Sequence, residues 1–282
     1  MKKQRAPGHD PLSLTLRVLV YAAGGVTALI IVFLIGYIAV MGIPNISPEL
    51  FSWTYSSENV SLTQSLINTV LMAFLSLMFS APLGIFAAIY LVEYARRGSK
   101  LVSAVRLASE TLAGIPSIVY GLFGMLLFVV YLRWGYSLLA GACTLAVMVL
   151  PLIMRTAEEA FLSVPDSYRE GSFGLGAGRL RVVFAIVLPS AMPGILAGII
   201  LAIGRIAGET AALIFTAGTV AKLPDSFFSS VRTLSVHMYS LSSEGLYLKQ
   251  SYATALVLIC LVLCINAASA YMAKKIAGGR NE

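Results

Sequence analysis

Long uninterrupted apolar runs are the feature that most limits what this chain can fold into. A helix needs roughly 20 apolar residues to cross the hydrocarbon layer of a membrane. Only 12% of the residues are charged, which is about half the usual proportion in a soluble domain. We therefore expect an all-α integral membrane protein with six transmembrane helices, at about 15–41, 64–92, 107–132, 137–156, 183–215 and 251–273.

Positive charge predicts how these helices are oriented, because cytoplasmic loops are enriched in lysine and arginine. If both termini are cytoplasmic, fifteen of the 20 cationic residues lie inside, four lie outside and Arg205 falls within a span. The inner residues are Lys2, Lys3, Arg5, Arg17, Arg96, Arg97, Lys100, Arg106, Arg155, Arg169, Arg179, Arg181, Lys274, Lys275 and Arg280. The outer residues are Arg133, Lys222, Arg232 and Lys249. This asymmetry predicts that both termini are cytoplasmic.

The chain divides into two parts on this topology. Residues 1–62 comprise a basic tail, the first transmembrane helix and an external (periplasmic) loop rich in turn formers and aromatic residues. The first apolar run is much longer than the core of a cleavable signal peptide, so we expect it to be retained as a helix. Residues 63–276 contain the other five spans. The external segment from about 216 to 250 is expected to hold a short interfacial helix.

A short cytoplasmic segment, about 156–181, joins the fourth and fifth spans and is rich in charged and small residues. Asp166 or Ser167, just after Pro165, can cap the start of a helix, and Glu170 follows in its first turn. Three glycines are expected to end that helix: Gly174, Gly176 and Gly178.

These glycines do not form a nucleotide-binding motif. Arg179 stands where the fingerprint G-x-G-x-x-G requires its third glycine, and the P-loop motif G-x-x-x-x-G-K-[ST] is absent from the chain. The histidines, His9 and His237, lie outside the spans, so we expect no catalytic set, no metal site and no enzyme activity. The cysteines are expected to be small packing residues: Cys143, Cys260 and Cys264.

The stretch from Glu170 to Pro189 resembles the EAA signature of ATP-binding-cassette (ABC) permeases, E-A-A-x-x-x-G, nine residues, then I-x-L-P. The matching positions are Glu170, Gly171, Ser172, Gly176, Ile186, Leu188 and Pro189. Gly171 and Ser172 stand where the signature has alanines, and both are small.

The resemblance implies a type I (MetI-like) ABC importer fold, with a permease domain at 63–276 and a coupling segment at about 156–181. In this family the short helix of that segment docks on a cytoplasmic ATPase and transmits its movement. Coupling roles are thereby implied for Glu170, Gly171, Ser172, Gly176, Leu188 and Pro189.

Two further stretches, GIPSIVYGLFG (114–124) and GRIAGETAALIFTAG (204–218), resemble the A-type permease of the phosphate-specific (Pst) system. This implies a subunit that moves inorganic phosphate across the inner membrane by alternating access. The implied partners are a homologous PstC-like permease, two PstB-like subunits that bind ATP and Mg, and a periplasmic or lipid-anchored PstS-like phosphate-binding protein. No cofactor is expected in this chain, and neither is a nucleic-acid partner.

Ionisable residues inside an apolar span are costly and usually face a pathway or cavity. Arg205 and Glu209 are four residues apart, so we expect them to share a helix face and to pair. Arg205 could contact a transported anion, or the pair could lock a gate at a subunit interface; both roles are open, and Thr210 adds a hydroxyl. Glu110 is a weaker pathway candidate that could equally reach the membrane surface.

Glycine and proline predict details of packing. Gly114 and Pro116 are expected to break or kink the third helix. Two pairs of glycines with small-xxx-small spacing favour close helix packing: Gly194 with Gly198, and Gly204 with Gly208.

Other functions are less compatible with the sequence. A secondary carrier would be expected to show internal repeats and no docking segment. An intramembrane enzyme would need nucleophiles or metal ligands within the spans. A permease for another oxyanion, molybdate or sulfate, is the nearest alternative to phosphate.

Overall fold

The computed structural model describes the backbone of residues 11–96, 98–243 and 245–278, with side chains from Leu14 in the first helix and up to Tyr271 in the last. Several residues used above lie outside it: Lys2, Lys3, Arg5, His9, Arg97 and Arg280. The described chain contains helices and connecting turns but no strand. The all-α prediction is thus confirmed.

The helical elements follow one another along the chain, with short 3₁₀ pieces (η1, η2) and π-helical pieces (η3, η4, η5) between α-helices. They are α1 (Pro11–Gly42), η1 (Ile43–Asn45), η2 (Pro48–Phe51), α2 (Thr63–Ile89), η3 (Tyr90–Tyr94), α3 (Lys100–Ala113), α4 (Ser117–Gly124), η4 (Met125–Tyr131), α5 (Leu138–Leu162), α6 (Asp166–Gly174), α7 (Arg179–Val182), η5 (Val183–Val187), α8 (Leu188–Gly208), α9 (Ala211–Thr216), α10 (Leu234–Ser243) and α11 (Leu248–Gly278).

Five of the helical segments are long and apolar enough to cross a membrane, and a sixth arises if α3 and the α4–η4 segment count as one bent span. The two halves of that span meet at 101°. The span begins earlier than the expected residue 107, because α3 starts at Lys100, and the break expected at Gly114 and Pro116 is confirmed. The proline ring disfavours helical backbone in the preceding residue, which accounts for a break there.

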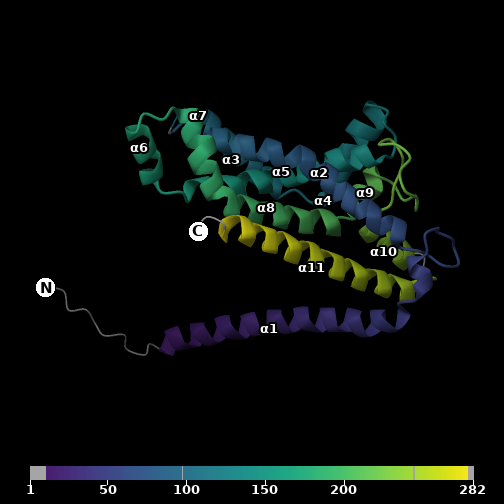
Figure 1. Cartoon of the computed structure of the whole chain (residues 1–282). Coiled ribbons are helices and arrows are strands. Elements are labelled where there is room, and N and C mark those ends of the chain that lie inside the picture. The colour runs from purple at the N-terminus through teal and green to yellow at the C-terminus, as the bar shows by residue number, and fades with distance from the viewer. Residues whose placement is uncertain (1–10, 97, 244, 279–282) are drawn as a thin grey trace.

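Helix α5 lies at the centre of the fold. It packs against α2 and α8, and two hydrophobic clusters run along it, one around Met148 and one around Phe161. In contrast, α1 packs mainly against α11 and leaves most of its apolar surface uncovered (Figure 1).

Glycines set the contact between α5 and α8. A Cβ on Gly198 would lie 2.0 Å from the Thr156 Oγ1 atom, and a Cβ on Gly194 would lie 2.6 Å from the Ala160 Cβ atom. The packing prediction is confirmed for this pair. For the second pair, a Cβ on Gly204 would lie 3.9 Å from the Asn266 Oδ1 atom of α11, whereas nothing in the described chain lies within 4 Å of a Cβ built on Gly208.

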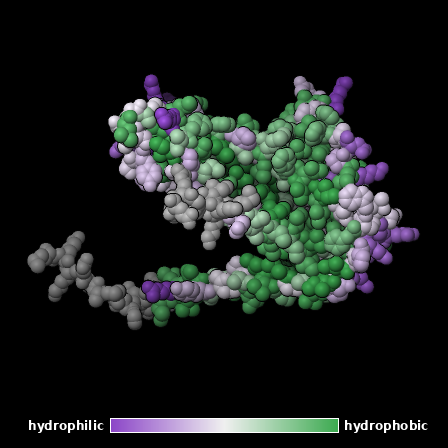
Figure 2. Space-filling model, viewed as in Figure 1, coloured by the Kyte–Doolittle hydropathy of each residue, from purple (hydrophilic) through white to green (hydrophobic). Residues whose placement is uncertain are grey.

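The two ends of the molecule differ in what they carry. Helix α1 begins and α11 ends on the side that holds α6, whereas α9 and α10 lie at the opposite end (Figure 1). Charged side chains gather toward these two ends, and the surface between them is hydrophobic (Figure 2). The arrangement is that of a membrane-spanning protein whose α6 lies at one membrane face.

The short helix expected within 216–250 is present as α10, and one part of it is packed into the fold. Its residues from Leu234 to His237 are buried, because α10 packs against α2 and α11. His237 is fully buried and its Nε2 atom lies 3.2 Å from the Val60 carbonyl oxygen. Burial, together with the nearby positive charge of Arg232, lowers the pKa of His237 to about 3.

Candidate functional site

The short helix predicted after Pro165 is confirmed as α6, which begins at Asp166 and ends at Gly174. The expected side-chain cap is wrong. Pro165 takes the N-cap position, no side chain caps the helix, and the Asp166 carboxylate instead accepts a hydrogen bond from Arg169 at 3.3 Å. After the helix, Gly176 has a φ of +80°, a backbone conformation that favours glycine.

One side of α6 and the turn after it is open to solvent. Tyr168, Glu170 and Phe173 are exposed, and Leu175 is 91% exposed. Gly171 also has nothing within 4 Å of a built Cβ. This surface therefore combines apolar side chains with a carboxylate and is not used for packing within the chain.

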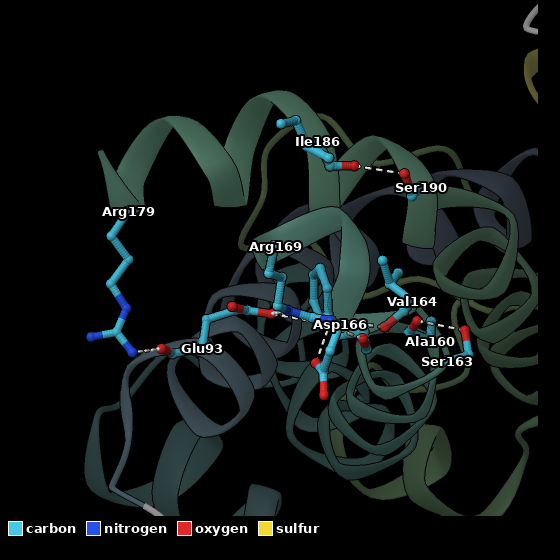
Figure 3. Close-up of polar contacts among 10 residues, drawn as sticks. Glu93, Ala160, Ser163, Val164, Asp166, Arg169, Arg179, Ile186 and Ser190 are labelled. Carbon is cyan, nitrogen blue, oxygen red and sulfur yellow. Dashed lines mark hydrogen bonds and ion pairs between the residues drawn. The ribbon is translucent and has the colours of Figure 1, made fainter. Parts of the chain in front are cut away.

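Arg169 holds the other side of α6 to the membrane helices (Figure 3). Its Nη2 atom lies 2.7 Å from Oε1 of Glu93, and its Nε atom lies 3.0 Å from the same oxygen. The guanidinium also donates to the carbonyl oxygens of Phe161 at 2.9 Å and Val164 at 2.7 Å. Arg169 thus binds one carbonyl in the last turn of α5, one just after that helix, and the end of η3 at the same time.

Arg179, on the far side of the glycine turn, reaches the same place. Its guanidinium donates to the backbone carbonyl of Glu93 and lies 5.0 Å from the centre of the Tyr94 ring (Figure 3). The segment from Arg169 to Arg179 is therefore attached at both of its ends to the C-terminal end of η3.

The I-x-L-P part of the signature lies where η5 meets α8. Pro189 cannot donate a backbone hydrogen bond, and a π-helical turn directly precedes α8. The Ser190 hydroxyl donates to the Ile186 carbonyl at 2.7 Å (Figure 3). Leu188 packs against the hydrophobic cluster around Phe161.

A cavity of about 570 Å³ lies between α3, α5 and α8. Apolar residues such as Met148 and Leu152 form part of its wall. Six ionisable residues also line it: Arg106, Glu110, Arg155, Glu158, Glu159 and Arg205. An apolar cavity with a few convergent charged groups is the usual form of a small-ligand site.

Two of the three arginines are paired within the cavity. The Nε atom of Arg106 lies 2.7 Å from Oε1 of Glu158. Arg155 lies between two carboxylates, with Nε 3.3 Å from Glu159 and Nη1 4.0 Å from Glu110. Arg205 is exposed and has no carboxylate within ion-pair distance among the described residues.

The arginines lie at different depths. Gly198 packs on Thr156, and Arg205 follows seven residues later on α8, which is about 10 Å along a helix. Because α5 and α8 run antiparallel, Arg205 is opposite the middle of α5, whereas Arg155 is closer to the α6 end. The cavity thus extends from the middle of the bundle toward α6.

The expected Arg205–Glu209 pair within one helix is wrong. Helix α8 ends at Gly208 and Glu209 has extended backbone, so the two residues do not share a helix face. The Glu209 carboxylate accepts a hydrogen bond from the Ala212 amide at 3.1 Å, near the start of α9. Thr210 is half-buried beside it, and its hydroxyl contacts the Gly208 carbonyl at 3.4 Å.

Glu93 and Arg169 were not among the candidate residues from the sequence. Glu93 lies 76 positions before Arg169 and belongs to no motif. The sequence feature that could have identified Glu93 is a carboxylate at the end of a long apolar run. A carboxylate that is buried there requires a cationic partner.

Residues 80–278 match the family described as "Binding-protein-dependent transport system inner membrane component". The chain belongs to this family. It is 36% identical over 237 residues to a probable ABC transporter permease protein, YqgI, of Bacillus subtilis, with 78% of this chain and 80% of the relative covered. It is 34% identical over 228 residues to phosphate transport system permease protein PstA 1 of Mycobacterium tuberculosis, with coverage of 77% and 74%.

The fold agrees with this family. The inward-facing structure of the MetNI methionine ABC transporter superposes with a TM-score of 0.59 and 20% identity, and covers 76% of this chain and 94% of that one. The chain has the MetI-like fold of ABC importer permeases. It is a multi-span membrane subunit of an ABC importer, and relatives of this kind are permeases rather than catalytic subunits.

Proposed function

We propose that this permease moves inorganic phosphate across the inner membrane by alternating access, driven by partner ATPases. The proposal rests on the arginine-lined cavity. Arg205 lies at its inner end without a carboxylate partner in the described chain, and a guanidinium offers paired donors that match phosphate oxygens. The similarity to PstA 1 supports phosphate as the anion.

The two roles considered for Arg205 are not equally supported. A gate in which Arg205 pairs with Glu209 of the same chain is not formed, because α8 ends at Gly208 and the Glu209 carboxylate instead accepts a hydrogen bond from the Ala212 amide. Arg205 faces the cavity. Transient contact with the transported anion is therefore our preferred role for Arg205, with Glu209 and Thr210 shaping the break between α8 and α9.

The coupling role is assigned to the EAA-like stretch. We place the ATPase contact on the open side of α6, with Glu170 and the exposed Phe173 toward the partner. Gly171 and Ser172 permit close approach, Gly176 reverses the chain, and Leu188 and Pro189 connect the turn to α8. Movement of α6 then reaches α5 and η3 through Arg169.

The proposed assembly contains this chain, a homologous PstC-like permease, two PstB-like subunits that bind ATP and Mg, and a PstS-like phosphate-binding protein. No cofactor is assigned to this chain. Both termini are placed in the cytoplasm, because α1 begins and α11 ends on the α6 side, where the ATPases would dock.

The test is ATP-dependent uptake by the complete complex in proteoliposomes, measured separately for phosphate, sulfate and molybdate. The proposal expects phosphate to be accumulated and the other two anions to be taken up poorly. Preferred uptake of sulfate or molybdate would instead assign the chain to another oxyanion.

A further inference from the structure

Three carboxylates line the same cavity as the three arginines: Glu110, Glu158 and Glu159. A cavity that only attracts anions gains nothing from them, because a carboxylate repels an oxyanion that carries no proton. Each carboxylate therefore serves either a structural ion pair or a contact with the ligand that does not depend on charge attraction.

The carboxylates differ in how they are held. The Glu158 side chain is 10% exposed and is bonded to both Nε and Nη2 of Arg106, which ties α3 to α5. The side chains of Glu110 and Glu159 are 72% and 66% exposed. Glu158 is thus occupied by a structural pair, whereas Glu110 and Glu159 keep oxygen atoms open to the cavity.

Arg155 brings these two open carboxylates to one place. Its guanidinium is within 4.0 Å of Glu110 on α3 and 3.3 Å of Glu159 on α5, and its side chain is 63% exposed. An oxyanion that binds Arg155 from the cavity consequently has carboxylate oxygens within hydrogen-bonding reach.

An ionised carboxylate can only accept hydrogen bonds. Inorganic phosphate keeps at least one hydroxyl at neutral pH and can donate to it, whereas sulfate and molybdate are fully deprotonated and cannot. We propose that Glu110 and Glu159, beside Arg155, select a protonated oxyanion. This inference rests on the proposed transport of phosphate and adds the residues that would exclude its unprotonated analogues.

The proposed selectivity depends on repulsion of unprotonated anions by the carboxylates as much as on attraction of phosphate. Arginine donors bind the anionic oxygens of any of the three anions, so they discriminate little among them. The carboxylates form a hydrogen bond with the phosphate hydroxyl but face sulfate or molybdate with uncompensated like charge. At hydrogen-bonding distance this difference corresponds to roughly tenfold or more in affinity.

The experiment measures anion binding in the cavity directly, on the purified permease–ATPase complex without the binding protein. Phenylglyoxal modifies accessible arginines, and mass spectrometry reports its reaction at Arg155 and Arg205 in the presence of phosphate, sulfate or molybdate. We expect phosphate to protect Arg155 at concentrations at least about tenfold below those of sulfate. Phosphate uptake by the same complex in proteoliposomes is recorded in parallel.

The variants are Glu110→Gln, Glu159→Gln and the double substitution, with Glu58→Gln in the external loop as the matched control. Glutamine keeps an acceptor oxygen but carries no charge. Phosphate should therefore still protect Arg155 from phenylglyoxal in these variants, whereas the sulfate concentration that protects Arg155 should be about tenfold lower than in the wild type. Glu58→Gln should behave as the wild type.

The possible failures are distinguishable. If the wild type takes up phosphate and both carboxylate variants still reject sulfate as strongly, the selectivity role is overturned and the proposed function stands. If the wild type takes up no phosphate, the proposed function fails. Equal protection by sulfate and phosphate in the wild type would also overturn the selectivity role.

Discussion

Arg169 on α6 and Glu93 at the end of η3 form an ion pair of 2.7 Å, although 76 positions separate them in the chain. Their side chains are only 14% and 9% exposed. The pair connects α6, where we propose that the ATPase docks, with η3 at the end of a long membrane helix. Since α5 is attached to the same guanidinium, α6 cannot move without displacing one of these helices or breaking the contacts.

Replacement of Arg169 by Gln should therefore impair both stability and coupling. The buried Glu93 would lose its partner, which costs about 3–5 kcal/mol for a buried pair. Arg169→Lys should be intermediate, because lysine keeps the charge but cannot reach Glu93 and both carbonyls together. The readouts are the melting temperature and the number of anions transported per ATP hydrolysed.

Arg181→Gln is the control for this prediction, since Arg181 is exposed in the same segment. A purely structural role would lower the melting temperature and leave the transport-to-hydrolysis ratio of the surviving complex unchanged. An Arg169→Gln complex of normal stability and normal ratio would show that the pair does not transmit movement.

Charge reversal at Glu170 should uncouple ATP hydrolysis from transport without unfolding the chain. Glu170 is exposed on α6, so the substitution leaves the internal packing intact. Hydrolysis and uptake are measured together for Glu170→Lys, with Glu58→Lys, in the exposed loop between η2 and α2, as control. Normal coupled uptake by Glu170→Lys would argue against the docking role of this surface.

The two glycines of the EAA-like stretch should respond in opposite ways to alanine. Gly171 is helical with open space around a built Cβ, so Gly171→Ala should stabilise α6 by about 0.5–1 kcal/mol. Gly176 has a φ of +80°, so Gly176→Ala should destabilise the turn by about 1 kcal/mol. Hydrogen exchange of the α6 amides is measured for both variants. Relative to the wild type, we expect slower exchange in Gly171→Ala and faster exchange in Gly176→Ala; slower exchange in Gly176→Ala would contradict the assigned turn.

The stability of the molecule should fall as the pH drops below about 6.5. His237 has a folded-state pKa of about 3, well below its ordinary value near 6.5 in an unfolded chain. The unfolded chain thus binds the extra proton between these values, which favours unfolding by up to about 1.4 kcal/mol per pH unit. Thermal unfolding in detergent from pH 7 to 4.5 should show this slope in the wild type and a shallower one in His237→Gln; identical slopes would exclude His237 as the cause.

The sequence contained much of the fold. Apolar runs located the spans, Gly114 and Pro116 marked the break in the third, and the segment after Pro165 was recognised as a short helix. These features depend on local composition and backbone chemistry, which a single sequence displays directly.

Contacts between residues that are far apart in the sequence could not be predicted in the same way. The spacing of Arg205 and Glu209 fits a helix pair, but spacing cannot show that the helix ends at Gly208. Likewise, nothing near Arg169 indicates that its partner is Glu93, because that contact depends on how α2 and α5 pack. The mixed charge of the cavity also became visible only when α3, α5 and α8 were brought together.

The most direct test of the central claim is ATP-dependent phosphate uptake by the wild-type and Arg205→Ala complexes in proteoliposomes. Arg205 is exposed to the cavity, so its truncation should leave assembly with the ATPase intact. The account predicts phosphate uptake by the wild type and a loss of about tenfold or more in the assembled variant. Near-normal uptake by Arg205→Ala would contradict the assignment of this cavity as the phosphate pathway.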